Sequence, residues 1–361
     1  MTFLLVFLVS FSFSVLFTPI TIYLAKKFGY VDDPEKHKHP AVLHKTIIPR
    51  AGGLALFCSF FLAALLFVGI SGQLLGIFAG GLILVLAGLI DDRRELNKGL
   101  RLFAQILAAI VVVGSGVGIA FITNPIASVL PGDFSVLRLD TLRIVFDFWG
   151  PHSILVLADL FAVLWIVWVI NMVNFSSGVD GQMPGIVFIA LIVLFLVSLK
   201  YSYSDPTQLM VSLLSLIGAA VTLGFLVFNF APARIFPGDS GSYFLGFLVA
   251  VLAILSGAKV GTAVLVMVVP LTDGVFTIIR RLSSKKSPLV GDRGHLHHKL
   301  LSLGLSQRQV ALFYWILCAI LGAIALNLNS TGKVFAILII GIIVLGGLIW
   351  LHMTLPIKGQ K

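Results

Sequence analysis

Long apolar segments alternate with short polar ones along almost the whole chain. A helix needs about 20 consecutive apolar residues to cross a membrane, and continuous apolar runs of this kind favour helices over a membrane barrel of strands. The pattern predicts eleven membrane-spanning helices. They are expected near residues 3–25, 51–70, 74–90, 101–122, 156–173, 185–203, 209–228, 242–257, 261–279, 309–327 and 334–353.

The composition agrees with this pattern. Of the 361 residues, 59% are hydrophobic and 11% are charged, whereas soluble domains carry about 25% charged residues. We therefore expect an all-α integral membrane protein in which residues 1–361 form a single polytopic domain. The first apolar segment lacks a basic start and a small-residue cleavage site, so we expect a retained span and not a cleaved signal peptide.

The net charge of +10 is divided unevenly between the two sides of the predicted bundle. Loops on one side, with their boundary residues, carry 20 of the 25 Lys and Arg residues, and the other side carries 5. Short cytoplasmic loops are enriched in Lys and Arg. We therefore expect a plasma (inner) membrane protein with its N-terminus outside and its C-terminus in the cytoplasm, and no nucleic-acid partner. On the outer side, residues 134–146 predict a small hairpin.

Asp91 and Asp92 end the third apolar segment, next to a basic cluster. Acidic groups at a membrane edge are candidates for function, and adjacent carboxylates repel each other unless a cation or a helix N-terminus is near. Both are therefore candidate catalytic residues. The alternative is a solvated helix end in which they pair with Arg93, Arg94 and Lys98.

Two further cytoplasmic segments carry oxygen ligands suited to hard metal ions. Asn171 and Asn174 lie three residues apart at the end of the fifth predicted span, and a turn-rich segment brings Asp180 back toward them. An ordinary polar turn is the alternative. In "FPGDSGS", Asp239 lies between glycines just before a span, where backbone N–H groups can approach an anion. This segment suggests a divalent metal that carries phosphates.

The last large cytoplasmic loop contains "DRGHLHHK", in which Arg293 precedes His295, His297 and His298. Cysteine partners and an HExxH pattern are missing from it, so a zinc site is not favoured. Guanidinium and imidazole N–H groups that bind a diphosphate fit better. The basic residues within 280–286 are more simply explained as an anchor to anionic lipid headgroups.

The first cytoplasmic loop ends in "HKTIIPRAGG", which contains His44 and Arg50. Its composition fits a phosphate-binding loop and a solvated loop equally well.

Taken in order, "GLIDDRREL", "NMVNFSSGVDGQMPG", "NFAPARIFPGDSGSYFLG" and "DRGHLHHKLLSLGLSQRQ" resemble the signature segments of the polyprenyl-phosphate N-acetylhexosamine-1-phosphate transferases. The resemblance covers residues 31 to 310 approximately and is greatest to the bacterial enzymes that attach GlcNAc-1-phosphate to undecaprenyl phosphate. It implies ten or eleven helices with the site on the cytoplasmic face.

The same resemblance implies a reaction. A UDP-sugar donates N-acetylhexosamine-1-phosphate to a polyprenyl phosphate, UMP leaves, and a cell-envelope polysaccharide is started. The implied cofactor is Mg²⁺, with Mn²⁺ as an alternative, and a homodimer is a candidate assembly.

The resemblance also implies roles for individual residues. Asp239 matches the metal-binding aspartate, and Asn174 its second ligand or near neighbour. Asp91 and Asp92 resemble a pair that positions or deprotonates the lipid phosphate, and Asp180 is similar to a residue that faces the nucleotide base. The other candidate substrate-binding residues are Asn171, His44, Arg293, His295, His297 and His298, of which the last four match a loop that holds the sugar and diphosphate.

The chain departs from the family pattern at two places. Ser177 stands where many bacterial members have an aspartate, although eukaryotic relatives also lack that acid. Residues 41–43 are Ala-Val-Leu where members often place Arg-Lys before the histidine. Three alternatives are open for the missing acid: its role is dispensable, Ser177 fills it, or the role is lost. Candidates to replace the missing base are Lys36, Lys38 and Lys45.

Two alternatives to this function remain open from the sequence. A transporter of an anionic solute would place polar residues and broken helices near the bilayer midplane, often in repeated halves. Here the polar residues collect at one predicted face and no repeat is evident. A member of the same family with a different UDP-sugar or an altered activity is the alternative within the enzyme class.

Overall fold

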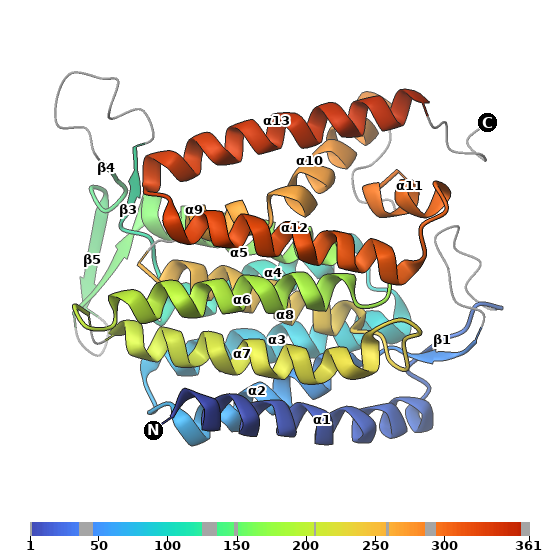
Figure 1. Cartoon of the computed structure of the whole chain (residues 1–361). Coiled ribbons are helices and arrows are strands. Elements are labelled where there is room, and N and C mark those ends of the chain that lie inside the picture. Colours follow the sequence, from blue (N-terminus) through green and yellow to red (C-terminus); the bar gives the residue numbers. More distant parts are fainter. Residues whose placement is uncertain are drawn as a thin grey trace.

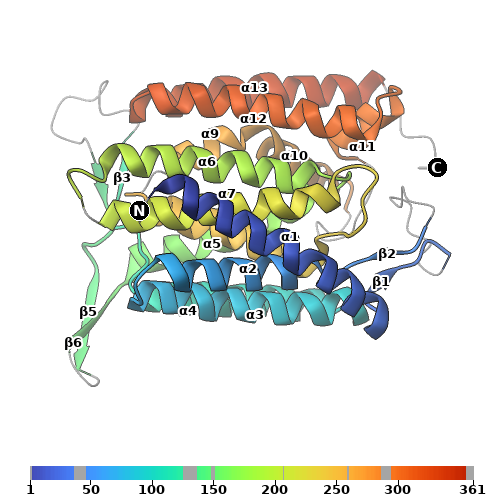
Figure 2. The ribbon, with the colours of Figure 1, turned by 60° about the horizontal axis from the view of Figure 1, so that its bottom comes forward.

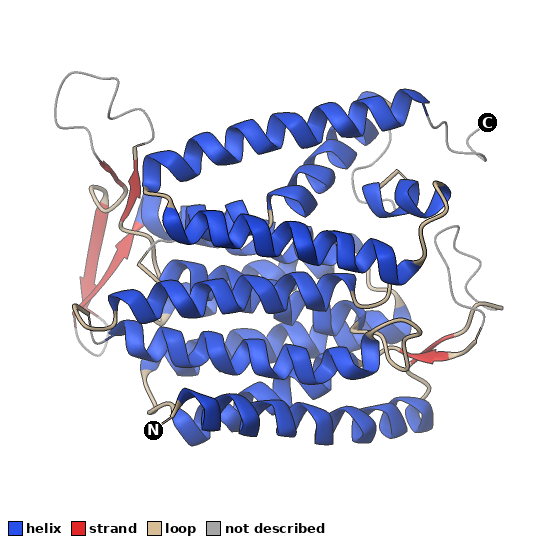
Figure 3. Cartoon of the chain, in the orientation of Figure 1, coloured by secondary structure: helices blue, strands red, loops and turns tan. Residues whose placement is uncertain are grey.

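The computed structural model describes residues 2–35, 46–124, 136–147, 151–205, 207–257, 260–285 and 294–354. Within these residues the chain forms a bundle of helices with short strands at its two ends (Figures 1 and 3). The helices are α1 (Phe3–Phe28), α2 (Gly52–Phe67), α3 (Gly72–Arg94), α4 (Lys98–Gly114), α5 (Val156–Phe175), α6 (Gln182–Tyr201), α7 (Thr207–Asn229), α8 (Gly238–Leu255), α9 (Val260–Val266), α10 (Val268–Ser283), α11 (Leu296–Ser302), α12 (Gln307–Asn327) and α13 (Ser330–Thr354). The strands are β1 (Val31–Asp32), β2 (Ile48–Pro49), β3 (Phe121–Thr123), β4 (Val136–Arg138), β5 (Arg143–Asp147) and β6 (Pro151–Leu155).

The all-α membrane fold is confirmed, but the count of eleven spans is not. Each predicted segment overlaps a helix, yet only eight helices in the described parts of the chain are long and apolar enough to cross a membrane. The count reaches nine if the bent pair α9–α10 forms one span. Helices α2 and α4 are shorter, with 16 and 17 residues.

The predicted span 261–279 is divided into two helices that meet at 80°. The break falls at Met267, three residues before Pro270. A proline lacks the N–H that would bond to the carbonyl four residues earlier, and its ring clashes with that carbonyl. Here that carbonyl belongs to Val266, the last residue of α9. A continuous helix through this point is therefore unfavourable.

Helix α8 lies at the centre of the bundle and packs against α2, α3 and α5. Within the most apolar 18 residues of α8, 89% are buried, against 6% in the corresponding stretch of α13, which lies at the outside. Figure 2 shows α12 and α13 on one side of the bundle and α3 and α4 on the other. The exposed apolar side chains of the outer helices are suited to face lipid. Helix α8, in contrast, is almost fully surrounded by protein.

The predicted hairpin within residues 134–146 is wrong, although both of its halves are extended. Strand β4 pairs with β3, and β5 pairs with β6, both in antiparallel register. Alternation of apolar and polar residues indicates strands but does not choose their partners, and each half finds a neighbour outside the segment. These strands lie at the opposite end of the bundle from β1 and α11 (Figure 1).

Gly88 of α3 and Gly53 of α2 allow the start of α8 to approach very closely. A Cβ atom at either position would overlap the backbone of Ser240. The two glycines thus fix how deeply the first turn of α8 sits between its neighbours.

We expect Gly88→Ala to lower the free energy of unfolding by about 1–3 kcal/mol, because overpacking at a tight contact displaces backbone. Thermal unfolding of the purified protein in detergent measures this change. Gly346→Ala is the matched control, because a Cβ there meets no atom within 4 Å; it is expected to change stability by less than about 1 kcal/mol. Equal melting temperatures for the two variants would contradict the packing role of Gly88.

Candidate functional site

The Asp92 side chain holds the N-terminus of α8. Its Oδ1 accepts the backbone N–H of Asp239 at 2.7 Å. Its Oδ2 accepts the N–H and the hydroxyl of Ser240 at 3.2 and 2.8 Å. The first N–H groups of a helix have no partner within the helix, and a carboxylate there is also stabilised by the helix dipole. Asp92, fully buried in its side chain, therefore fixes the position of Asp239.

Arg50 joins Asp92 to Asp239. Its Nε lies 3.0 Å from Asp92 Oδ1, and its Nη2 lies 2.7 Å from Asp239 Oδ2. Burial lowers the pKa of Arg50, but the carboxylates of Asp92 and Asp239 raise it by more, so the net shift is upward. The guanidinium is therefore charged at every accessible pH. The Phe236 N–H donates to the Pro49 carbonyl at 2.8 Å, and the Gly52 N–H donates to the Phe236 carbonyl at 3.1 Å, so β2 and the start of α2 are held against the loop before α8.

Asp91 is held by different neighbours from those of Asp92. Its Oδ1 accepts the N–H of Leu96 at 2.7 Å and pairs with Arg101 Nη2 at 2.8 Å. Its Oδ2 accepts the hydroxyl of Tyr243 at 3.2 Å. The side chain of Asp91 is fully buried. It therefore ties the end of α3 to α4 and α8.

Asp239 and Asn174, which the family resemblance pairs, are in contact. Asn174 Nδ2 donates to Asp239 Oδ1 at 3.3 Å, and Asn174 Oδ1 accepts the Ser242 hydroxyl at 2.9 Å. The side chain of Asp239 keeps 11% exposure. Among the described residues no group of three His, Cys, Asp or Glu side chains is arranged to hold a metal. Mg²⁺ needs only one or two carboxylates when substrate phosphates and waters complete its shell, so the Asp239 carboxylate fits it. The Asn174 oxygen, which here accepts from Ser242, would become a second ligand after a flip of the amide group.

Asn171 and Asp180 both contact protein groups. The Asn171 amide donates to Gln105 Oε1 at 2.7 Å and to the Val167 carbonyl at 2.8 Å. Asp180 Oδ2 accepts the N–H of Ala233 at 2.9 Å. These contacts tie α5 to α4 and the turn after α5 to the loop before α8. Ser177, where many relatives have an aspartate, donates its hydroxyl to the Asn174 carbonyl at 2.6 Å.

The three predicted histidines lie together at α11. His295 Nδ1 lies 3.0 Å from Asp273 Oδ2, and Asp273 Oδ1 accepts the N–H of Leu296 at 2.9 Å. A carboxylate at Nδ1 favours the tautomer with the proton on that nitrogen, which leaves Nε2 to accept from Arg281 Nη2 at 3.4 Å. Asp273 thus fastens α11 to α10 through His295.

His297 is the buried ring at the centre of this cluster. It stacks on His295 at 5.4 Å and lies 4.3 Å from His298, measured between ring centroids. A Cβ at Gly178 would overlap its ring, so the turn after α5 packs directly on it. Its Nδ1 has no hydrogen-bond partner in the described chain. Burial lowers the pKa of His297 well below its ordinary value, and His298 and His295 lower it further.

Two cations near the histidines, Arg281 and Lys299, are buried. Arg281 keeps only 3% exposure and contacts His295, so the prediction of a lipid anchor is wrong for this residue. Lys299 keeps 2% exposure, and its Nζ has no hydrogen-bond partner among the residues that the structure describes. Burial and Arg280 lower the pKa of Lys299 to about 8, while Asp273 opposes them.

The structure therefore brings most of the predicted residues to one end of the bundle. Asp91, Asp92, Asn174 and Asp239 lie around the start of α8, and the histidines pack on the turn after α5. His44 and Arg293 lie outside the described residues. Sequence reasoning missed the roles of Arg101, Tyr243, Gln105, Asp273 and Lys299. The sequence feature that could have identified these residues is a polar side chain beside or within an apolar segment.

This chain is similar to a known protein family. Residues 74–257, about half of the chain, match the model of glycosyl transferase family 4. The chain belongs to glycosyl transferase family 4.

Relatives of this family 4 glycosyltransferase are similar over most of its length. It is 31% identical over 347 residues to a Bacillus subtilis protein named "Probable undecaprenyl-phosphate N-acetylglucosaminyl 1-phosphate transferase", covering 94% of this chain and 88% of the relative. A decaprenyl-phosphate N-acetylglucosaminephosphotransferase of Mycolicibacterium smegmatis is 30% identical, covering 89% of this chain and 81% of the relative. An undecaprenyl-phosphate alpha-N-acetylglucosaminyl 1-phosphate transferase of Escherichia coli K12 is 28% identical, covering 87% of this chain and 80% of the relative.

We expect Asp92→Asn to destabilise the glycosyltransferase by about 3–5 kcal/mol, because the amide removes the buried negative charge that pairs with Arg50 Nε and accepts the first N–H groups of α8. Thermal unfolding in detergent measures the change. Asp140→Asn is the matched control, since Asp140 pairs with Arg138 at the surface; no change in melting temperature is expected. A variant Asp92→Asn as stable as this control would refute the anchoring role.

The melting temperature of the glycosyltransferase should fall as the pH drops from 7 to 5, in part through His297. The unfolded chain binds a proton at this histidine near pH 6.5, whereas the folded chain keeps the ring neutral, so acid favours unfolding. His297→Gln should make this decline shallower, and His352→Gln, at an exposed site on α13, should not. Parallel pH profiles for wild type and His297→Gln would contradict the assignment.

Proposed function

We propose that this chain transfers GlcNAc-1-phosphate from UDP-GlcNAc to a polyprenyl phosphate, which releases UMP and forms a polyprenyl-diphospho-GlcNAc. The observation that carries the proposal is the meeting of Asp239 and Asn174 beside the Arg50–Asp92 pair at one end of a membrane bundle. The printed names of the relatives give the acceptor class and the sugar. Family membership favours this enzyme over a transporter.

Asp239 and Asn174 would hold Mg²⁺, with Mn²⁺ as a substitute. The ion would neutralise charge on the diphosphate as the bond to UMP breaks. In the transfer itself, an oxygen of the acceptor phosphate forms a bond to the phosphorus that carries the sugar, and the bond from that phosphorus to the UMP oxygen breaks. Such a reaction depends mainly on positioning and electrostatics.

Asp91 and Asp92 act in this proposal as positioning residues. The acceptor phosphate has a second pKa of about 6, by analogy with a phosphoserine, so it is largely ionised at neutral pH and needs no strong base. Each carboxylate already accepts or pairs with several protein groups. Asp92 aligns Asp239, and Asp91 keeps Arg101 and Tyr243 in place.

The histidine cluster supplies the second part of the proposed site. His297 packs on the turn that follows Asn174, and Lys299 adds a buried cation nearby. We assign the sugar and diphosphate to the histidine side of the site. We also propose that the protein lies in the plasma (inner) membrane with the site facing the cytoplasm. The excess of Lys and Arg in the loops at this end supports that orientation.

Full-length protein in detergent should release UMP only when UDP-GlcNAc, undecaprenyl phosphate and Mg²⁺ are all present. A panel with UDP-GalNAc and other UDP-sugars tests the donor. Asp239→Ala should lower the rate about 100-fold or more, a size typical of losing an electrostatic contributor at a reacting phosphate. Asp140→Ala, at the opposite end, should keep the wild-type rate.

Metal binding gives a second readout that does not depend on turnover. Electron paramagnetic resonance titration with Mn²⁺ should show weaker binding to Asp239→Ala and Asn174→Ala than to Asp140→Ala. Unchanged Mn²⁺ affinity in both site variants would refute the metal assignment. Release of UMP with another sugar, and not with UDP-GlcNAc, would refute the proposed donor.

A further inference from the structure

Strands β5 and β6 form an isolated pair at the end of the bundle opposite the candidate site (Figure 1). Their residues are in antiparallel register, and among the described residues neither strand joins a third one. A pair of strands on its own is at best marginally stable in water. The β5–β6 pair therefore depends on a surface that covers one of its faces. The proposed transfer reaction uses none of its residues.

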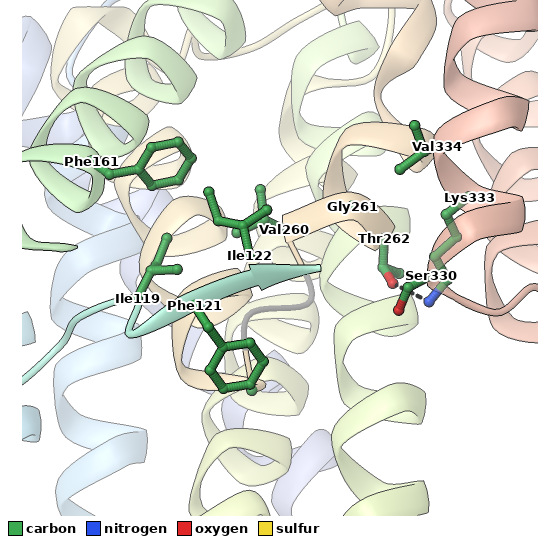
Figure 4. Close-up of a pocket in the computed structure, with 11 residues that line it drawn as sticks. Ile119, Phe121, Ile122, Phe161, Val260, Gly261, Thr262, Ser330, Lys333 and Val334 are labelled. Atoms are coloured by element: carbon green, nitrogen blue, oxygen red, sulfur yellow. Dashed lines mark hydrogen bonds between the residues drawn. The ribbon is translucent and has the colours of Figure 1, made fainter. Parts of the chain in front are cut away.

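Strand β3 at the same end of the bundle, in contrast, packs on the helices. Ile122 lies on the side of β3 that faces Phe161 of α5, and the two side chains line a pocket of about 430 Å³ (Figure 4). Both also pack against the hydrophobic core of the bundle. None of the described side chains of β5 and β6 belongs to that core or packs against it. The bundle therefore leaves the β5–β6 pair largely uncovered.

The register gives the β5–β6 pair one apolar face. Successive side chains of a strand point to opposite faces, and Ile144 lies directly opposite Ile154. Leu142 continues this face, because its carbonyl accepts the N–H of Val156 and so extends the ladder. Leu142, Ile144 and Ile154 are 53%, 54% and 44% exposed. The described side chains of the other face are Arg143, Val145, Ser153 and Leu155. Polar side chains are thus confined to one face of the described part of the pair.

The β5–β6 pair lies across the ends of the helices. In Figures 1 and 2 most helices run nearly parallel, and both strands run across that direction. Membrane-spanning helices are tilted by about 20° on average from the bilayer normal, so the pair lies close to the plane of the membrane surface. Helix α5, a candidate span, begins at Val156, directly after β6. Asp159 fixes this junction, since its Oδ2 accepts the N–H of Leu155 at 3.0 Å. The pair is therefore at the depth where a span meets the lipid headgroups.

The apolar face of the pair continues the lipid-facing side of α5. Leu157, Leu160 and Leu164 are exposed, and their spacing of three and four residues places them on one side of the helix. On a candidate membrane span, such a side faces lipid. Ile154 comes three residues before Leu157, and no polar residue lies between them. The exposed apolar surface therefore passes from the span to the strand pair.

We propose that the β5–β6 pair binds the surface of the lipid bilayer, with Leu142, Ile144 and Ile154 inserted at the boundary between headgroups and acyl chains. An amphipathic element that lies in the plane of the interface is held there by burial of its apolar face. The face with Arg143 and Ser153 points to the water. The contact supplies the cover that an isolated strand pair lacks, and it anchors the first turn of α5. It is independent of the proposed transfer reaction.

Single spin labels on the full-length protein in phosphatidylcholine–phosphatidylglycerol vesicles test this contact. The background is Cys58→Ala, because Cys318 is buried and out of reach of the label. Unlabelled sites are checked by the absence of signal from this background protein. Ile144→Cys and Ile154→Cys report on the apolar face. Thermal unfolding checks that each variant folds, as is expected for exposed positions.

Arg143→Cys and Ser153→Cys are the matched controls, since they lie on the other face of the same strands. Electron paramagnetic resonance then compares collisions with oxygen, which concentrates in hydrocarbon, and with a nickel chelate, which stays in water. Labels at Ile144 and Ile154 should gain oxygen collisions and lose nickel collisions, as should a label at Leu160→Cys on the lipid-facing side of α5. The two control labels should show the opposite.

Three results would overturn the proposal. The first is strong collision with the nickel chelate at all four strand positions, which would place both faces in water. The second is weak collision with both reagents at Ile144 and Ile154, which would mean that protein covers this face. Dipolar coupling between labels on two molecules would then identify a second copy of the chain as the cover. The third is more oxygen contact at Arg143 and Ser153 than at the two isoleucines, which would mean that the opposite face meets the lipid.

Discussion

The carboxylate of Asp92 at the N-terminus of α8 is the interaction on which the rest of the site depends. Helix α8 is the most buried span, and its first turn lies where α2 and α3 come closest to it. Unpaired N–H groups at such a buried end would be costly. Asp92 satisfies two of them and pairs with Arg50, which also reaches Asp239. The same contacts that stabilise the helix end therefore set the position of the proposed metal ligand.

Two adjacent aspartates are useful here because successive residues of a helix point in different directions. In an α-helix neighbouring side chains diverge by about 100°. Asp91 turns toward Arg101 and Tyr243, and Asp92 turns toward Arg50 and Ser240. Each charge thus meets its own cation and its own hydroxyl. One turn of α3 is thereby fixed to α4, to α8 and to the strand before α2.

The histidine cluster repeats this arrangement with a second buried acid. Asp273 accepts the first N–H of α11 and orients His295, as Asp92 accepts the first N–H groups of α8. His297 is then held on Gly178, in the turn that follows Asn174. The two halves of the candidate site are therefore joined through the end of α5. A buried polar network of this kind is stable only when its charged members are paired.

The pattern of residues along the chain was enough to predict the helical membrane fold and the clustering of polar residues at one end, whereas the pairing of Asn174 with Asp239 was implied only by the family resemblance. Apolar runs and their polar boundaries are local features, so they can be read along the chain. The tertiary structure alone decided which cation pairs with which aspartate and which strand pairs with β5. Arg50 lies 189 positions from Asp239, and the N–H groups that Asp92 accepts lie 147 and 148 positions away. Such partners are chosen by the packing of whole helices, and no local pattern of residues encodes that choice.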